Sequence, residues 1–455
     1  MNGAVAAQPP MAKLALTSLA GASIEWFDFF LYGVASALVF PALYFPKTMP
    51  PTIALLASFS TFAVGFFARP VGAILFGHFG DRAGRKAALA GALTLMGIAT
   101  TLIGCLPSYA KIGALAPTLL VLLRFMQGLA IGGQWGGAML LVVESAPAHR
   151  RGFYGSFPQV GAPAGVVLAN LAFLTVGALT SHDSFLAWGW RIPFIVSIAL
   201  VGLAYYVHVR IEETPAFRQL KASRDRQPQS RALVALSDAP VPTPLRRSPI
   251  IDALLSHPRQ ILLAAGAFLA VQVSFYVAIT FVVAYGTNPA LGLGLSPSTM
   301  LGAIMASSAI MAPSLLLFGS LSDRFGRRRV YMTGAALVGL WSFAFFPLIE
   351  TRSPLLITVA ITVSLMFNAL MYGPQAALFG ELFKTRVRYS GASLGYQFGA
   401  MFGGGLAPLI ATWILQHYHS TFGVSLYMAG ACLVTLLSVA LLGETGTVDM
   451  SGTDG

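Results

Sequence analysis

The decapeptides GHFGDRAGRK (residues 77–86) and GSLSDRFGRR (residues 319–328) share one pattern. Gly, Asp, Arg, Gly and Arg recur at identical offsets in both, and each copy lies between the second and the third long apolar segment of its half of the chain. Self-similarity of this kind is the sequence signature of an internal repeat. The sequence therefore predicts two related halves.

The composition identifies the class of protein. Of the 455 residues, 56% are hydrophobic and only 10% are charged, and the mean hydropathy is +0.74. These values exclude an ordinary soluble domain. Apolar windows of about 20 residues, the length that crosses the hydrocarbon core as a helix, recur throughout the chain. We predict twelve transmembrane helices, near residues 14–43, 53–76, 87–107, 117–143, 152–180, 190–209, 260–286, 299–319, 330–349, 354–380, 389–416 and 422–443.

The longest polar segment divides these twelve spans into two sets of six. Residues 210–259 are rich in Arg and Pro, as in KASRDRQPQSR and PVPTPLRRSP, and cannot bury a core. We predict an all-α integral membrane protein with a six-helix bundle at 1–209, a cytoplasmic linker at 210–259, and a second six-helix bundle with a short tail at 260–455. Parallel six-span repeats imply a pseudo-twofold axis along the membrane normal and a ligand site near the midplane, between the bundles.

Orientation follows from the positions of Lys and Arg, which cytoplasmic loops retain. Placing residue 1 in the cytoplasm puts most of the 28 Lys and Arg residues on that side, and the opposite loops keep only Lys47, Lys111, Arg191 and Arg352. We therefore expect a multi-pass protein of the cell inner membrane with both termini cytoplasmic. The net charge of +12 is explained by this topology and by contact with anionic lipid, so no nucleic-acid partner is expected.

Enzyme signatures are missing from the sequence. It contains no His-Glu-x-x-His, no phosphate-binding loop of the Walker type, no G-x-S-x-G elbow and no cluster of Cys and His ligands. We predict that the protein is not an enzyme, with no catalytic residues, no metal and no cofactor.

Four ionisable residues lie inside predicted spans of the first half: Glu25, Asp28, Arg69 and Arg124. At 1.5 Å per helical residue, Glu25 and Arg69 fall in one layer near the midplane, and Asp28 and Arg124 share a second layer. Each costs on the order of 3 kcal/mol at the bilayer centre on insertion scales, so pairing of opposite charges is expected. We predict that Asp28 pairs with Arg124 when deprotonated and releases it when protonated. Static ion pairs that fix helix packing, Asp28 with Arg124 and Glu25 with Arg69, remain the alternative.

The chain resembles the major facilitator superfamily over essentially all twelve spans. The repeated G-x-x-x-D-R-x-G-R-[RK] is that superfamily's signature, and the narrower resemblance is to its metabolite:proton symporters, which include carriers of shikimate, 2-oxoglutarate, citrate and proline or betaine. The residues that carry this resemblance are EWFDFFLYG, ARPVGAILFGHFGDRAGRK, RFMQGLAIGGQWGGA, ESAPAHRRGFYGSFPQVGAP, WGWRIPF and EETPAF, in this order.

The resemblance implies roles for the charged residues. Asp28 and Arg124 match the positions of a span-one aspartate and a span-four arginine that act in proton coupling in related sugar carriers, and Glu25 is the second candidate proton carrier. The charged residues of the repeated loops are expected to form gating contacts that break and reform; the alternative is a set of charged turns that merely satisfy the positive-inside rule. The expected gating residues are Asp81, Arg82, Arg85, Glu144, Asp323, Arg324, Arg327 and Glu381.

One position departs from the family pattern. Where the family carries Glu in a G-G-E-[WY] segment, this chain has Gln134, which cannot carry a proton. Coupling would then depend on Glu25 or Asp28. Arg69, or Arg124 once released, could bind a substrate carboxylate through its planar guanidinium.

Further hydrogen-bonding and aromatic residues of the spans are candidates for the cavity wall, with interhelical hydrogen bonding as the alternative for each. The complete predicted substrate-binding set is Arg69, Gln134, Gln127, Tyr32, Gln272, Tyr276, Asn368, Tyr372, Gln375, Tyr396 and Gln397. We predict a monomeric secondary active transporter that takes up a small carboxylated metabolite with a proton by alternating access. The alternatives are a uniporter or exporter without proton coupling, and a transporter-like receptor without flux.

Overall fold

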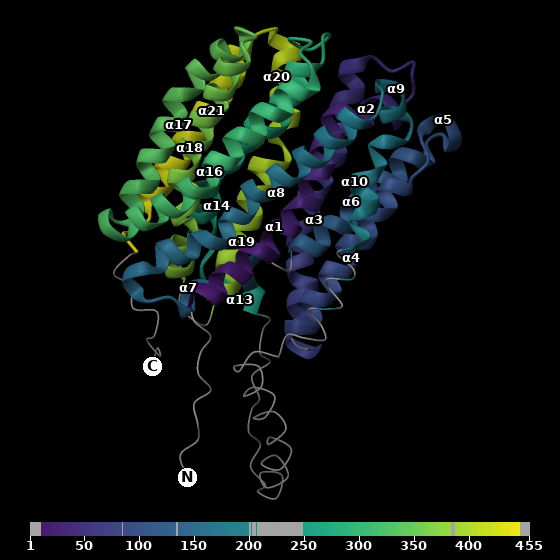
Figure 1. Cartoon of the computed structure of the whole chain (residues 1–455). Helices are drawn as coiled ribbons and strands as arrows, with labels where there is room; N and C mark the ends of the chain where they lie inside the picture. The colour runs from purple at the N-terminus through teal and green to yellow at the C-terminus, as the bar shows by residue number, and fades with distance from the viewer. Residues whose placement is uncertain are drawn as a thin grey trace, which may run out of the picture.

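A computed structural model describes residues 11–83, 85–132, 135–199, 202, 206, 249–383 and 387–445. At 77–78, 80–83, 85–86, 89, 135–138 and 249–252 it describes the backbone alone. Every regular element within these ranges is helical (Figure 1). Long apolar segments in a bilayer must satisfy their backbone groups internally, which a helix does.

The first half supplies the helices drawn in purple to blue in Figure 1. They are α1 (Met11–Leu38), α2 (Phe40–Leu43), α3 (Pro51–Ala83), α4 (Arg85–Cys105), α5 (Tyr109–Ile112), α6 (Leu115–Gly132), α7 (Trp135–Ser145), η1 (Ala148–Arg150), α8 (Arg151–Leu179), α9 (His182–Ser184), η2 (Phe185–Gly189) and α10 (Arg191–Val196).

The second half supplies the teal to yellow helices. They are α13 (Pro249–Ser256), α14 (Pro258–Tyr276), η3 (Val277–Phe281), α15 (Val282–Thr287), α16 (Pro297–Phe325), α17 (Arg327–Glu350), α18 (Pro354–Leu382), α19 (Arg388–Ala400), η4 (Met401–Gly405), α20 (Ala407–Tyr418) and α21 (Thr421–Leu441).

The predicted all-helical membrane architecture is confirmed. Among the described residues, 10 helical segments are long and apolar enough to cross a membrane, and Ala90–Cys105 is a shorter apolar helix at the predicted third span. The predicted sixth span, 190–209, begins as α10, and most of its second half lies outside the described residues.

Two features differ from the expected pattern of uniform spans. Helix α13 and the start of α14 lie within residues 210–259, which the sequence predicted as linker; Pro249 and Pro258 each stand at a first helical position, where proline costs no hydrogen bond. The predicted spans at 260–286 and 389–416 are each interrupted by a π-helical segment, η3 and η4. In η4 three consecutive glycines, Gly403–Gly405, allow the widened turn.

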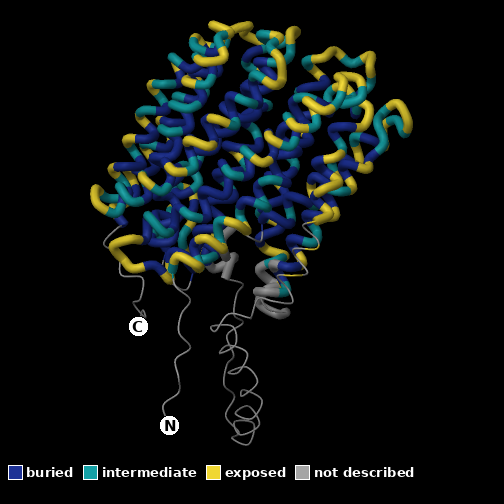
Figure 2. The backbone as a smooth tube through the Cα atoms, in the orientation of Figure 1, coloured by how far each residue is buried: buried dark blue, intermediate teal, exposed yellow. Residues whose placement is uncertain are grey.

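The two halves meet along long helices that pack side by side. Helix α8 packs against α1 of its own half and against α16 and α18 of the other, while α3 packs against α6 and against η4. Buried residues concentrate along this junction, and exposed residues lie at the two ends and on the outer face (Figure 2). Both termini leave the molecule at one end, which we call the terminal end; the other is the distal end (Figure 1).

Glycines bring α3 and α6 into backbone contact. A Cβ on Gly128 would lie 2.1 Å from the carbonyl oxygen of Gly65, and one on Gly132 would lie 2.0 Å from that of Arg69. Only glycine fits at such distances. Close approach of these two helices sets the positions of Arg69 on α3 and Arg124 on α6.

Candidate functional site

Arg69 lies fully buried at the junction of the halves. Its guanidinium carbon is 4.1 Å from the ring centroid of Phe66 and 4.5 Å from that of Phe29, and it also lies over Trp26. None of its three side-chain nitrogens has a hydrogen-bond partner within the described part of the chain. A guanidinium offers five N–H donors in a planar fork, so this group is held by aromatic faces while its hydrogen-bonding capacity is unused.

Elements of the second half approach Arg69 from the other side. The Tyr276 ring packs edge-on against Phe66, with centroids 5.2 Å apart, and the glycines of η4 contact both rings. The Tyr276 hydroxyl is close enough to interact electrostatically with Arg69, but no hydrogen bond of normal geometry links them. Tyr396 on α19 also interacts with the Arg69 charge. Donors from both halves therefore converge on one buried point.

Arg124 is equally buried but is better satisfied. Its Nη1 donates to Oε1 of Gln127 at 3.1 Å and its Nε donates to the carbonyl of Phe62 at 3.4 Å. Its guanidinium carbon lies 4.0 Å from the Phe29 centroid and 4.2 Å from that of Tyr32. Only Nη2 lacks a hydrogen-bond partner.

The structure does not form the predicted Asp28–Arg124 ion pair. No salt bridge within 4 Å joins them, although both side chains are described and fully buried. Asp28 instead accepts a hydrogen bond on Oδ1 from the Ser197 hydroxyl at 2.5 Å, and its Oδ2 has no partner. Arg69 likewise makes no ion pair with Glu25 among the described residues. In this state Asp28 is therefore bonded to a hydroxyl group, and Arg124 to an amide and a backbone carbonyl.

Glu25 lines a small cavity with Trp26, Ile131 and Tyr396. Residues of α1, of α6 and of α19 from the second half therefore meet at this cavity. Gln134, the other residue predicted for this layer, lies outside the described residues.

Two residues of the predicted substrate-binding set have their polar atoms engaged within the protein. The Tyr32 hydroxyl donates to Oγ1 of Thr61 at 2.6 Å. Gln127 accepts from Arg124 and donates through Nε2 to Oγ1 of Thr100 at 2.7 Å. Both residues therefore have partners within the first half in this state.

The predicted residues of the second half are all buried near the junction. Asn368 donates to the Val271 carbonyl and to Ser274, and Gln397 donates to the Gly132 carbonyl of the first half at 3.4 Å. Tyr372 and Tyr396 pack on Phe268. Several side-chain atoms have no hydrogen-bond partner among the described residues: Gln272 Nε2, Asn368 Oδ1, both Gln375 amide atoms and Gln397 Oε1.

Part of the predicted gating set closes the terminal end. Asp323 on α16 accepts from the backbone amides of Gly152 and Phe153 in the first turn of α8, both at 2.9 Å. Arg327 pairs with Asp323 at 2.6 Å and with Glu381 at 3.4 Å. Carboxylates are stabilised at helix N-termini, so the Asp323 carboxylate joins the halves.

The remaining predicted gating residues lie in different surroundings from one another. Glu144 pairs across the halves with Arg388 at 3.1 Å, whereas Arg324 is exposed on the last turn of α16. The second repeated motif makes its turn at the single residue Gly326, whose φ is +93°. For the first motif the backbone of Asp81 and Arg82 ends α3 and that of Arg85 begins α4, while the side chains of these three residues lie outside what the structure describes.

Sequence reasoning missed Ser197, Thr100 and Arg388 as members of the site. Arg388 follows span ten as Arg151 follows span four, so the repeat offered a signal for it. Ser and Thr are common in membrane helices, where they bond to their own backbone, so nothing in the sequence distinguishes Ser197 and Thr100.

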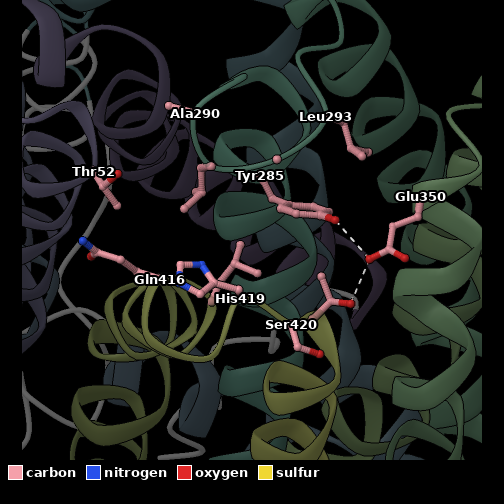
Figure 3. A pocket seen from close by; sticks show the side chains of 12 residues that line it. Thr52, Tyr285, Ala290, Leu293, Glu350, Gln416, His419 and Ser420 are labelled. Carbon is pink, nitrogen blue, oxygen red and sulfur yellow. Dashed lines mark hydrogen bonds between the residues drawn. The ribbon is translucent and has the colours of Figure 1, made fainter.

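A cavity of about 640 Å³ lies at the distal end (Figure 3). Glu350 forms its polar wall, accepting hydrogen bonds from Tyr285 at 3.0 Å and from Thr421 at 2.8 Å. Gln416 and His419 line it from α20 and its C-cap, and Thr52 comes from α3 of the first half. No set of three or more His, Cys, Asp or Glu side chains in the described ranges is grouped to hold a metal ion.

Comparisons with known proteins agree with this architecture. Residues 14–448 match the family model described as "Sugar (and other) transporter". The inner membrane metabolite transport protein YhjE of Escherichia coli K12 is 40% identical over 435 residues, covering 95% of this chain and 94% of the relative. The shikimate transporter of the same strain is 38% identical, with coverages of 95% and 94%.

More distant relatives are similar over nearly the same length. The proline/betaine transporter of Salmonella typhimurium LT2 is 30% identical over 433 residues, covering 95% of this chain and 83% of the relative. Among solved structures, the xylose transporter XylE of E. coli in a partially occluded inward-open conformation has a TM-score of 0.72 at 18% identity, covering 96% of this chain and 98% of that chain.

Proposed function

The chain belongs to the sugar (and other) transporter family of the major facilitator superfamily, and from this premise we propose that it carries a small carboxylated metabolite together with a proton. It is a multi-span membrane transporter and not an enzyme. The class of substrate, the coupling to a proton and the direction of transport are what we propose. The proposed direction is uptake into the cell.

The observation that carries the proposal is the state of Arg69. A fully buried guanidinium whose three nitrogens have no hydrogen-bond partner is costly, because buried donors normally find acceptors. A ligand carboxylate would satisfy the fork with two parallel N–H···O bonds. The phenol of Tyr276 and the amides of Gln272 and Gln375, which have unpartnered atoms among the described residues, could bind hydroxyl groups of the same ligand. The shikimate transporter among the relatives is named for such a hydroxylated carboxylate.

Asp28 is the proposed proton carrier, with Glu25 as the second. A buried carboxylate with one oxygen unpartnered is unfavourable in a membrane, whereas a proton on Oδ2 of Asp28 removes the charge. Deprotonation would then favour movement of the Arg124 guanidinium toward this carboxylate. Exchange of partners between these states is the proposed coupling step.

We assign the terminal end to the cytoplasm, since the sequence places most Lys and Arg residues in the loops on the side of the N-terminus. Bundles 1–209 and 260–455 would rock about the central site while residues 210–259 link them, in a monomer with the complete site in one chain. In this proposal the Asp323 and Arg388 contacts belong to a state closed toward the cytoplasm, and the distal cavity of Figure 3 faces the opposite side of the membrane.

The test is uptake into proteoliposomes under an imposed inward proton gradient. Labelled shikimate is the first probe, followed by a panel of mono- and dicarboxylates and zwitterions. We expect uphill uptake of a carboxylate that collapses with a protonophore. Arg69→Lys should weaken apparent affinity at least tenfold, since Lys cannot form the bidentate contact, and Asp28→Asn should abolish uphill uptake while leaving counterflow.

Three results would overturn parts of this assignment. Wild-type proton-driven uptake in Asp28→Asn or Arg69→Lys removes that residue's role. Downhill flux that ignores the protonophore identifies a uniporter or exporter. Binding without flux, scored by thermal stabilisation of the purified protein, identifies a receptor.

A further inference from the structure

A chain of buried polar side chains occupies the space between Asp28 and Arg124. Ser197, just beyond α10, donates to Asp28 Oδ1, whereas the hydroxyl of Thr100 on α4, near the same carboxyl group, donates to the Met96 carbonyl at 2.9 Å. Thr100 accepts from Gln127 Nε2 at 2.7 Å, and Gln127 Oε1 accepts from Arg124 Nη1 at 3.1 Å. All five side chains are at most 1% exposed. Arg124 is therefore bonded to Gln127 and, through it, to Thr100, while Asp28 is bonded to Ser197, and the acid and the guanidinium are not in contact.

Gln127 determines where the Arg124 guanidinium lies. Both ends of its amide are engaged, so its rotation is fixed: the oxygen faces Arg124 and the nitrogen faces Thr100. Held there, Arg124 stacks on Phe29 and Tyr32 and leaves Nη2 without a partner. Asp28 also keeps an unpartnered oxygen, so the two groups remain available to each other.

We propose that Gln127 and Ser197 are positioning residues with opposite effects on proton release: Gln127 holds Arg124 away from a protonated Asp28, and Ser197 stabilises the carboxylate once the proton has left. This rests on the proposed function, in which Asp28 carries the proton. Loss of Gln127 frees Arg124 to approach Asp28, which favours the carboxylate. Loss of Ser197 removes a hydrogen bond that the carboxylate accepts, which favours the acid.

The other charged or titratable groups around Asp28 are shared by both variants. Glu25 lies one turn away on α1, Arg69 stands on α3, and the phenol of Tyr32 lies beneath Arg124. The described parts of α4, α8 and α10 contribute no other charged side chain to this region, since Arg151 and Arg191 lie at the terminal and distal ends. A difference in sign between the two variants therefore reports on Gln127 and Ser197 themselves.

The test needs no substrate. Purified full-length protein in liposomes is titrated with pH while the carbonyl stretch of protonated carboxylic acids is followed by infrared difference spectroscopy, and the band lost in Asp28→Asn is assigned to Asp28. We expect the midpoint of this band to move to lower pH in Gln127→Leu, by tenfold or more in proton affinity, and to higher pH in Ser197→Ala, by roughly tenfold. Ser197→Thr should restore the wild-type midpoint.

Matched controls exclude a general loosening of the core. Ser36 on α1 and Gln159 on α8 are buried and bonded to backbone carbonyls, so Ser36→Ala and Gln159→Leu should leave the midpoint unchanged. If Gln127→Leu does not fold, Gln127→Met, of similar length, replaces it. An unshifted midpoint, or shifts of the same sign in the two variants, overturns this inference alone. Absence of any Asp28-dependent band in the wild type overturns the proposed proton carrier, and the inference with it.

Discussion

At the scale of single residues, Gly65 decides whether Arg124 can lie against α3. A Cβ at this position would stand 2.6 Å from Arg124 Nε, so Gly65→Ala must displace the guanidinium. Alanine in a helix gains about 0.5–1 kcal/mol over glycine, but here displacement of a functional group outweighs that gain. We expect uptake in proteoliposomes to fall roughly tenfold or more.

The control for this substitution is Gly177 on α8, where a Cβ meets nothing within 4 Å. Gly177→Ala should keep wild-type uptake and unfold at the same or a higher temperature. Equal uptake in the two variants would contradict the assigned position of Arg124.

The buried ionic residues of the site could be predicted from sequence, but their partners could not. Glu25, Asp28, Arg69 and Arg124 are conspicuous because charge in a membrane span is expensive. Whether Asp28 contacts Arg124 or Ser197 depends on side-chain rotamers and on which helices pack against each other. A single sequence gives information on neither. No sequence pattern predicts the hydrogen bonds that Ser197 and Thr100 make.

At the scale of elements, the turn between α16 and α17 consists of Gly326 alone. Its φ of +93° is unfavourable for residues with a Cβ, and that Cβ would lie 2.7 Å from a carboxylate oxygen of Glu444. We expect Gly326→Ala to destabilise the protein by about 1–2 kcal/mol, measured as a lower midpoint of thermal unfolding in detergent.

Gly302, inside α16, is the comparison for this turn, because a Cβ there meets nothing within 4 Å. Gly302→Ala should be neutral or stabilising. A loss of stability as large as that of Gly326→Ala would show that the backbone angle is not the cause.

Hydropathy predicted where the long helices lie, but it did not predict where they are interrupted. Long apolar runs predicted continuous spans at 260–286 and 389–416, but the structure interrupts them with the π-helical segments η3 and η4. In η4, Gly405 packs so closely against Phe66 that a Cβ there would lie 2.9 Å from its side chain. Helix α13 was missed because it is short and adjoins a polar segment whose composition dominates the hydropathy average.

At the scale of the whole molecule, Asp323 holds the halves together at the terminal end. Its two hydrogen bonds to α8 are charge-assisted, each worth about 1.5–3 kcal/mol. We expect Asp323→Ala to accelerate hydrogen exchange of the amides of Gly152 and Phe153 by at least tenfold, as the first turn of α8 opens. Asp183→Ala, at an exposed aspartate in α9, should leave exchange in this turn unchanged. Unaltered protection in Asp323→Ala would mean that other contacts keep this end closed.

The Asp323 contact has a consequence for anyone who searches homologues for correlated substitutions. Its partners in the first half are main-chain N–H groups, which every residue except proline presents. Position 153 can therefore vary without weakening the contact, and position 152 is restricted by the lack of room beside Gly319, Ser322 and Arg327. An analysis of correlated substitutions between alignment positions would therefore not detect this contact between the halves, even where the transport cycle depends on it.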